Sequence, residues 1–187
     1  MKNICKFSSG FTLVELVIVI AVFGIMTSMA APSFMNMMRD NRTITQTNEL
    51  VGSLHLARSE AARRGVQVTI RSNSVTDNNW DQGWTVFTDW DGNGTFNDDD
   101  DALKCEPEED CKLRIQAALP NNMTLRTANN YTTWLAYLPS GLPVSPGVGG
   151  GDTFRVCPSS ADTARARSVV INITGRPNTQ GETSSCP

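Results

Sequence analysis

The sequence predicts an α+β fold in which one long N-terminal helix packs on an antiparallel β-sheet domain. Residues 11–31 form an apolar run that is long enough to cross a bilayer as a helix. Residues 32–64 then place apolar side chains at three- and four-residue spacing, as an amphipathic helix does. After Gly65 the pattern changes to short alternating segments separated by Pro-, Gly- and Asn-rich breaks, which is typical of short strands.

The apolar run contains one ionisable side chain, the carboxylate of Glu15. An ionised carboxylate at the centre of a bilayer costs about 2.5–3.5 kcal/mol on insertion scales, so its presence indicates a function. A short leader containing Lys2 and Lys6 precedes the run. An ordinary secretory signal is cleaved after its apolar segment, whereas here the best cleavage site follows Gly10 and precedes the segment. Cleavage there would leave the helix on the mature chain.

The stretch GFTLVE, from Gly10 to Glu15, resembles the class III signal of type IV pilins and type II secretion pseudopilins. The resemblance implies a pilin fold, cleavage after Gly10 by the prepilin peptidase, and N-methylation of Phe11. It also implies that Glu15 pairs with the free N-terminal amine of a neighbouring subunit in a filament. This role agrees with the cost of leaving a buried charge unpaired.

The segments ARSEAARRG, residues 57–65, and WDQGWTVFTDWDGNGTF, residues 80–96, are similar to the GspH/FimT/FimU group of minor pilins and pseudopilins. The resemblance implies a low-copy subunit that primes or caps a filament tip. Its partners would be other minor and major pilins, the prepilin peptidase and the inner-membrane assembly platform. We expect a single inner-membrane span with a periplasmic C-terminal domain, and a pilus or pseudopilus after assembly. The residues do not separate pilus from type II secretion.

Four regions are expected along the chain: a leader over residues 1–10, a membrane and filament-core helix over 11–31, its amphipathic continuation over 32–64, and an exported β domain over 65–187. Gly24 and Pro32 predict kinks, because proline removes a helical hydrogen bond. Gly65 predicts the helix end. We expect strands over residues 66–71, 83–89, 113–117, 123–126, 131–138, 153–157 and 168–174, and a flexible loop over 139–151.

Five cysteines become four when Cys5 leaves with the leader. Disulfides persist in exported domains, and four cysteines allow three pairings. We expect Cys105–Cys111, which closes a short acidic loop, and Cys157–Cys186, which ties the last residues to the domain much as major pilins pin a C-terminal segment. The spacings do not suit a zinc site.

The acidic turn after residue 88 fits an EF-hand-like calcium loop. Oxygen ligands would come from Asp89, Asp91, Asn93, the Thr95 carbonyl and Asp100. A plain Asn-Gly hairpin turn is the alternative reading of the same residues. A bound ion would order the loop and would have no catalytic role.

A DNA-binding role for uptake is a second alternative, carried by Gly175 and Arg176. These two residues match part of a Gly-Arg-x-Arg element of FimT-type uptake pilins, but Asn178 replaces the second arginine. One arginine is a weak phosphate anchor unless others share its face. The candidates for that face are Arg126, Arg155, Arg165 and Arg167.

The charge of the chain is uneven, with ten acids and one base in residues 89–110. The net charge of −3 becomes −5 without the two leader lysines, which argues against a general nucleic-acid binder. We expect no enzyme activity and no small-molecule substrate, since His55 is the only histidine and lies on the predicted helix. Some of the four tryptophans are expected to fill the β-domain core, and others to cover it.

Overall fold

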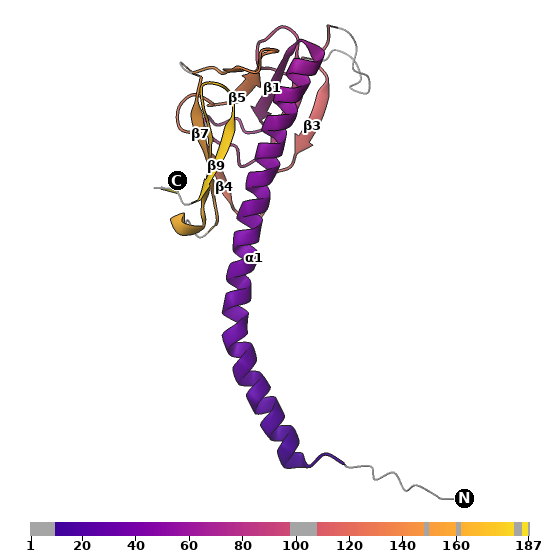
Figure 1. Cartoon of the computed structure of the whole chain (residues 1–187), viewed down its shortest axis with the longest axis vertical. Helices are drawn as coiled ribbons and strands as arrows, with labels where there is room; N and C mark the ends of the chain where they lie inside the picture. The colour runs from indigo at the N-terminus through magenta and orange to yellow at the C-terminus, as the bar shows by residue number, and fades with distance from the viewer. Residues whose placement is uncertain (1–9, 98–107, 148–149, 160–161, 182–184, 187) are drawn as a thin grey trace, which may run out of the picture. The chain divides into compact units, whose positions relative to one another are not determined.

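The computed structural model describes residues 10–97, 108–147, 150–159, 162–181 and 185–186. The chain divides into two compact units, residues 1–39 and 40–187. Helix α1 runs over Leu13–Arg64 (Figure 1), so its first part belongs to the first unit and its last part to the second.

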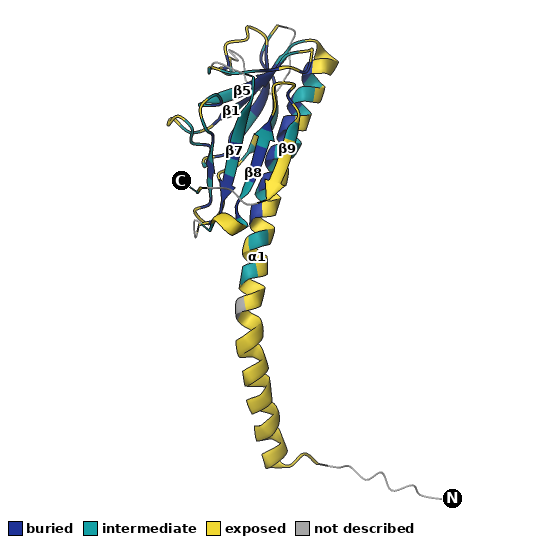
Figure 2. Cartoon of the chain, turned by 60° about the vertical axis from the view of Figure 1, so that its left-hand side comes forward, coloured by how far each residue is buried: buried dark blue, intermediate teal, exposed yellow. Residues whose placement is uncertain are grey.

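The described part of the first unit consists mainly of helical turns of α1, whose apolar side chains are exposed around the helix (Figure 2). The helix continues without interruption through Gly24 and Pro32, and the kinks expected there stay a prediction. Thr27 donates its hydroxyl to the Phe23 carbonyl at 2.9 Å, which gives this polar side chain a partner within the apolar stretch. No side chain of the second unit is needed to form these turns, because their hydrogen bonds are local.

The second unit contains the last turns of α1 and two antiparallel sheets. The first sheet has the order β3-β2-β1-β5-β6, with β1 Gln67–Ser72, β2 Trp84–Asp89, β3 Lys112–Gln116, β5 Trp134–Tyr137 and β6 Pro143–Val144. The second has the order β4-β7-β8-β9, with β4 Thr124–Arg126, β7 Asp152–Cys157, β8 Arg167–Ile171 and β9 Pro177–Gly181. A short 3₁₀ turn, η1 Thr163–Arg165, precedes β8.

The seven strands expected from the sequence are present, and their boundaries agree to within three residues. Two further strands, β6 and β9, were not expected, and the loop prediction for residues 139–151 is wrong where it covers β6. Both strands begin with proline and lie at sheet edges, where the missing proline N–H costs no ladder hydrogen bond. Their polar or proline-rich sequences therefore lack the alternation that marks a strand.

The strand expected over residues 168–174 ends earlier, at Ile171. A tight turn follows, in which Gly175 donates its N–H to the Asn172 carbonyl at 2.9 Å and has a φ of +77°. The Asn172 side chain also accepts hydrogen bonds from the N–H groups of Thr174 and Arg176. An asparagine that bonds to the backbone ahead of it favours a turn over a strand.

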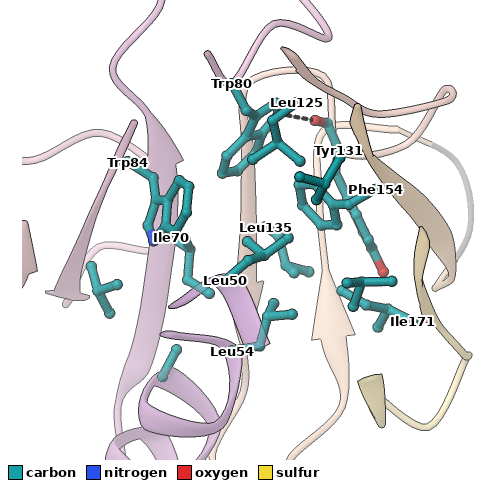
Figure 3. Packing of buried hydrophobic residues seen from close by; sticks show 14 of the residues in the cluster. Leu50, Leu54, Ile70, Trp80, Trp84, Leu125, Tyr131, Leu135, Phe154 and Ile171 are labelled. Atoms are coloured by element: carbon teal, nitrogen blue, oxygen red, sulfur yellow. Dashed lines mark hydrogen bonds between the residues drawn. The ribbon is translucent and has the colours of Figure 1, made fainter. Parts of the chain in front are cut away.

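The core of the second unit lies between α1 and the two sheets. The predicted apolar face of α1 is confirmed, since Leu50, Leu54, Ala57 and Ala61 are all fully buried. Figure 3 shows Leu50 and Leu54 from the helix near Leu135 and Ile70 of the first sheet, with Phe154 and Ile171 of the second sheet across the core. Burying a leucine side chain stabilises the fold by about 1.5–3 kcal/mol, so this face holds the helix to the domain.

The helix ends where the sequence predicts. Gly65 has a φ of +73° and donates its N–H to the Ala61 carbonyl at 2.9 Å. Glycine adopts this left-handed conformation without a steric penalty, so the chain can turn from α1 into β1.

Candidate functional sites

The N-terminal site begins with a helix cap at Thr12. The N–H of Glu15 donates to Thr12 Oγ1 at 3.2 Å, and the N–H of Leu16 donates to the Thr12 carbonyl at 3.2 Å. A threonine followed by a glutamate three residues later is the capping-box pattern, a sequence signal that identifies Thr12. Gly10 and Phe11 precede the helix and are exposed. The predicted cleavage site between Gly10 and Phe11 therefore lies on exposed backbone that precedes the helix.

Glu15 lies in the first turn of α1, and its side chain is exposed within this chain. An acid is favoured there because helix N-termini carry partial positive charge. Within the described residues, α1 is the one helix whose length and apolar composition suffice to span a membrane. The large apolar side chains in its first part, such as Phe23 at 67% exposure, are not covered by any of the described residues.

A second candidate site is the acidic turn that follows β2. Asp89 is fully buried, and its Oδ2 accepts hydrogen bonds from Thr69 Oγ1 at 2.5 Å, Gln67 Nε2 at 2.9 Å and the Gly94 N–H at 2.9 Å. Its Oδ1 is also buried and has no hydrogen-bond partner in the described part of the chain. Asp89 thus joins the turn to β1 while keeping one acceptor atom free.

The next polar residues of the turn hold one another in place. Asp91 Oδ1 accepts the Asn93 N–H at 3.1 Å, and Asn93 Oδ1 accepts the Thr95 N–H at 2.6 Å. Asp91 Oδ2 accepts the amide of Asn97 at 3.0 Å. Four of the five expected calcium ligands therefore belong to one ordered turn, whereas Asp100 lies outside the described residues.

Asp110, which is distant in sequence, binds the backbone of the acidic turn at two places. Its two carboxylate oxygens accept the N–H groups of Trp90 and Asn97, each at 2.9 Å. Burial raises the pKa of Asp110, and the charges of Asp89 and Asp91 act in the same direction. This role of Asp110 could not be recognised in the sequence, because Asp110 and Trp90 are twenty residues apart and no local pattern links them.

A surface cavity of about 530 Å³ adjoins the turn and is lined by Trp90, Phe96 and several acidic side chains. Trp90 is 45% exposed, whereas Trp80 and Trp84 are fully buried in the core. The prediction that some tryptophans fill the core of the β domain and others cover it is confirmed. Trp80 donates its Nε1–H to the Tyr131 carbonyl at 3.0 Å, so the buried indole has a partner (Figure 3).

The predicted disulfide between Cys157 and Cys186 is confirmed, with a Cα–Cα distance of 5.8 Å. It ties the C-terminal residues to strand β7. Cys111 is buried next to β3. Its expected partner, Cys105, lies outside the described residues, so that pairing stays a prediction.

The arginines proposed for DNA contact have different surroundings. Arg176 is exposed in the turn between β8 and β9, while Arg126, the last residue of β4, is paired with Asp81. Arg165 forms salt bridges with Asp162 at 2.9 Å and Asp40 at 3.3 Å. Two of the five candidate cations are therefore already neutralised by partners in the chain. DNA binding through Gly175 and Arg176 stays an untested prediction.

Comparison with known proteins identifies the family and the fold of the chain. The family described as type II transport protein GspH matches residues 46–175, and the prokaryotic N-terminal methylation motif matches residues 5–31. Two curated relatives from Pseudomonas aeruginosa, both named fimbrial protein, are 33% identical over 89 residues, or 48% of this chain and 56% of each relative. The chain thus spans little more than half the length of these relatives.

Two crystal structures of the type IV minor pilin FimU from Pseudomonas aeruginosa strain PAO1 share the fold. One covers 79% of this chain and 96% of FimU with a TM-score of 0.57 and 20% identity. The other covers 75% and 96% with a TM-score of 0.52, again at 20% identity. The expected α+β arrangement of a long helix and an antiparallel β domain is confirmed as the pilin fold.

Proposed function

Because the chain belongs to the GspH family of type II transport proteins, we propose that it is a minor pilin that assembles into a type IV pilus. The observation that carries this proposal is the first part of α1, where apolar side chains are exposed around the helix and Glu15 is the one acid. Such a surface requires either lipid or other apolar helices around it. A filament subunit uses both environments in turn.

Before assembly, the helix spans the inner membrane once, and the β domain lies in the periplasm. The prepilin peptidase cleaves after Gly10 and frees the amine of Phe11, which is then N-methylated. The match of the methylation motif to residues 5–31 supports this order of events. The cap at Thr12 supports it too, because it starts the helix two residues after the cleavage site.

During assembly, Glu15 pairs with the N-terminal amine of a neighbouring pilin. A carboxylate among apolar helices is costly alone, and a cation at short range removes most of that cost. The pair therefore sets the axial register of neighbouring subunits, and the apolar side chains supply the packing between them. By the sequence resemblance described above, we expect this subunit in the complex that primes or caps the filament tip.

The test is incorporation of the full-length chain into filaments sheared from cells. Replacing Glu15→Gln keeps the size of the side chain but removes its charge, and should reduce incorporation at least tenfold while leaving the amount in the membrane unchanged. The matched control is Glu49→Gln, on the same helix but in the second unit. Equal incorporation of Glu15→Gln and the unchanged chain would contradict the proposal.

Mass spectrometry of the filament-associated chain tests the processing step. The N-terminal residue should be Phe11 carrying one added methyl group. A chain that retains residues 1–10 within filaments would contradict the proposed cleavage.

The alternative assignment is a pseudopilin of type II secretion, which the name of the matching family favours. The naming of the two curated relatives as fimbrial proteins favours the pilus. Deleting the gene distinguishes the two. Loss of surface pili with normal export of secreted enzymes supports the pilus, and the reverse result supports the secretion system.

A further inference from the structure

The acidic turn contains a buried oxygen that lacks a partner. Asp89 is fully buried, and three donors already bond to its Oδ2, while Oδ1 has none in the described part of the chain. Buried polar atoms in native proteins nearly always have a partner, and a buried charge without a counterion is especially costly. The partner of Oδ1 must therefore be a cation or a hydrogen-bond donor that the described side chains do not supply.

The basic side chains at this turn do not supply that cation. Arg71 donates to the carbonyl oxygen of Gly94 rather than to a carboxylate. Lys112 lies 4.2 Å from the centre of the Phe96 ring, in a cation–π contact. Within the described residues, neither Arg71 nor Lys112 therefore forms a salt bridge with Asp89 or Asp91.

We propose that the turn binds a calcium ion through the side chains of Asp89, Asp91 and Asn93 and the main-chain carbonyl of Thr95. These residues stand at alternate positions, the spacing at which a calcium loop supplies its first four ligands. Gly94 stands at the position that calcium loops reserve for glycine, and its φ is +73°. Calcium takes six to eight oxygens, so water completes the coordination in this proposal.

The hydrogen bonds of the turn are compatible with such ligands. The three ligand side chains each accept an N–H from a residue ahead of them, namely Gly94, Asn93 and Thr95. These bonds orient the carboxylate and amide groups and leave each with further acceptor capacity. Among the described residues no three His, Cys, Asp or Glu side chains gather closely enough to hold a metal. The proposed calcium ligands do not form such a cluster, because only two of the four, Asp89 and Asp91, are acidic side chains.

The site does not depend on pilus assembly, so it can be tested on the full-length chain in detergent micelles. The first probe is terbium, which replaces calcium and emits when an adjacent tryptophan transfers energy to it. Trp134 lies directly against Gly94 and serves as the energy donor. Excitation of tryptophan should give saturable terbium emission that calcium abolishes by competition.

The variant Asp91→Asn removes the charge of an exposed ligand and should weaken terbium binding at least tenfold. The matched control is Asp77→Asn, an exposed aspartate outside the turn, which should leave binding unchanged. Absence of saturable emission from the unchanged chain would overturn the proposal. Equal weakening by both variants would also overturn it, since it would indicate general attraction to negative charge.

Thermal unfolding gives a second, independent readout. Calcium at one hundred times its Kd should raise the Tm by roughly 5–10 °C. Magnesium should raise it less, because it demands a smaller octahedral site. A Tm that calcium does not change, or that both ions raise equally, would contradict a calcium site.

Discussion

Trp134 of β5 lies so close to Gly94 that a β-carbon on this glycine would stand 2.3 Å from the indole Cε2 atom. The contact joins the acidic turn to the first sheet. Arg71 reinforces it by donating a hydrogen bond to the Gly94 carbonyl. The turn therefore has its shape set by the domain as well as by its own polar side chains.

Replacing Gly94→Ala should destabilise the domain by about 2–4 kcal/mol, because it adds left-handed backbone strain to overpacking against Trp134. Gly92→Ala is the matched control. Its φ of +71° is nearly the same, but its added carbon would meet nothing closer than a Gln67 side-chain atom at 3.6 Å. That variant should lose about 1–2 kcal/mol. Urea unfolding measures both, and equal losses would show that Trp134 does not constrain the turn.

Ser53 on α1 accepts a hydrogen bond from the buried indole N–H of Trp84 at 2.9 Å. Ser53→Ala leaves that donor unsatisfied in the core and should cost about 1–3 kcal/mol. The control is Ser59→Ala, an exposed serine on the same helix, which should change stability by less than about 0.5 kcal/mol. Chemical unfolding followed by tryptophan fluorescence provides the comparison. Similar values for the two variants would argue against a contribution from the Trp84 bond.

Glu60 near the end of α1 should make the domain sensitive to acid. Hydrogen bonds from Arg63 and then Arg64 lower its pKa from 4.5 to about 2. Because the folded pKa lies below the unfolded value, the stabilisation is fully present above pH 4.5 and is lost as the pH falls towards 2. These pairs lie near the surface, so the effect should be about 1 kcal/mol.

Measuring unfolding free energy across this pH range tests the prediction. The variant Glu60→Gln should show a flatter pH dependence than the unchanged chain, while Asp77→Asn should not. An unchanged slope in Glu60→Gln would mean that other carboxylates cause the acid sensitivity.

Removing the C-terminal disulfide should destabilise the domain, because Cys157 and Cys186 are separated by 29 residues. A cross-link across a loop of this length contributes about 3.5 kcal/mol in the chain-entropy description. Cys186→Ala should lose this amount, and the double variant with Cys157→Ala should lose no more. Thermal unfolding under non-reducing conditions checks this, and a loss below about 1 kcal/mol would contradict it.

Helical periodicity was the most reliable guide to the fold. The spacing of Leu50, Leu54, Ala57 and Ala61 identifies the buried face because residues three and four apart share one side of a helix. Edge strands β6 and β9 were not recognisable, because each begins with proline and lacks the alternation that marks a strand, although each pairs with the strand just before it in the chain. The same limit applies to Asp110, whose partners lie across the acidic turn.

The sequence alone determined the N-terminal processing motif, the apolar helix with Glu15, the amphipathic face and most of the strands. Each of these depends on local spacing or on composition, which can be read along one stretch of chain. The tertiary structure decided the division into two sheets, the cap that Asp110 places on the acidic turn, and the free oxygen of Asp89. Those features depend on which distant segments meet, and packing of the whole domain determines that.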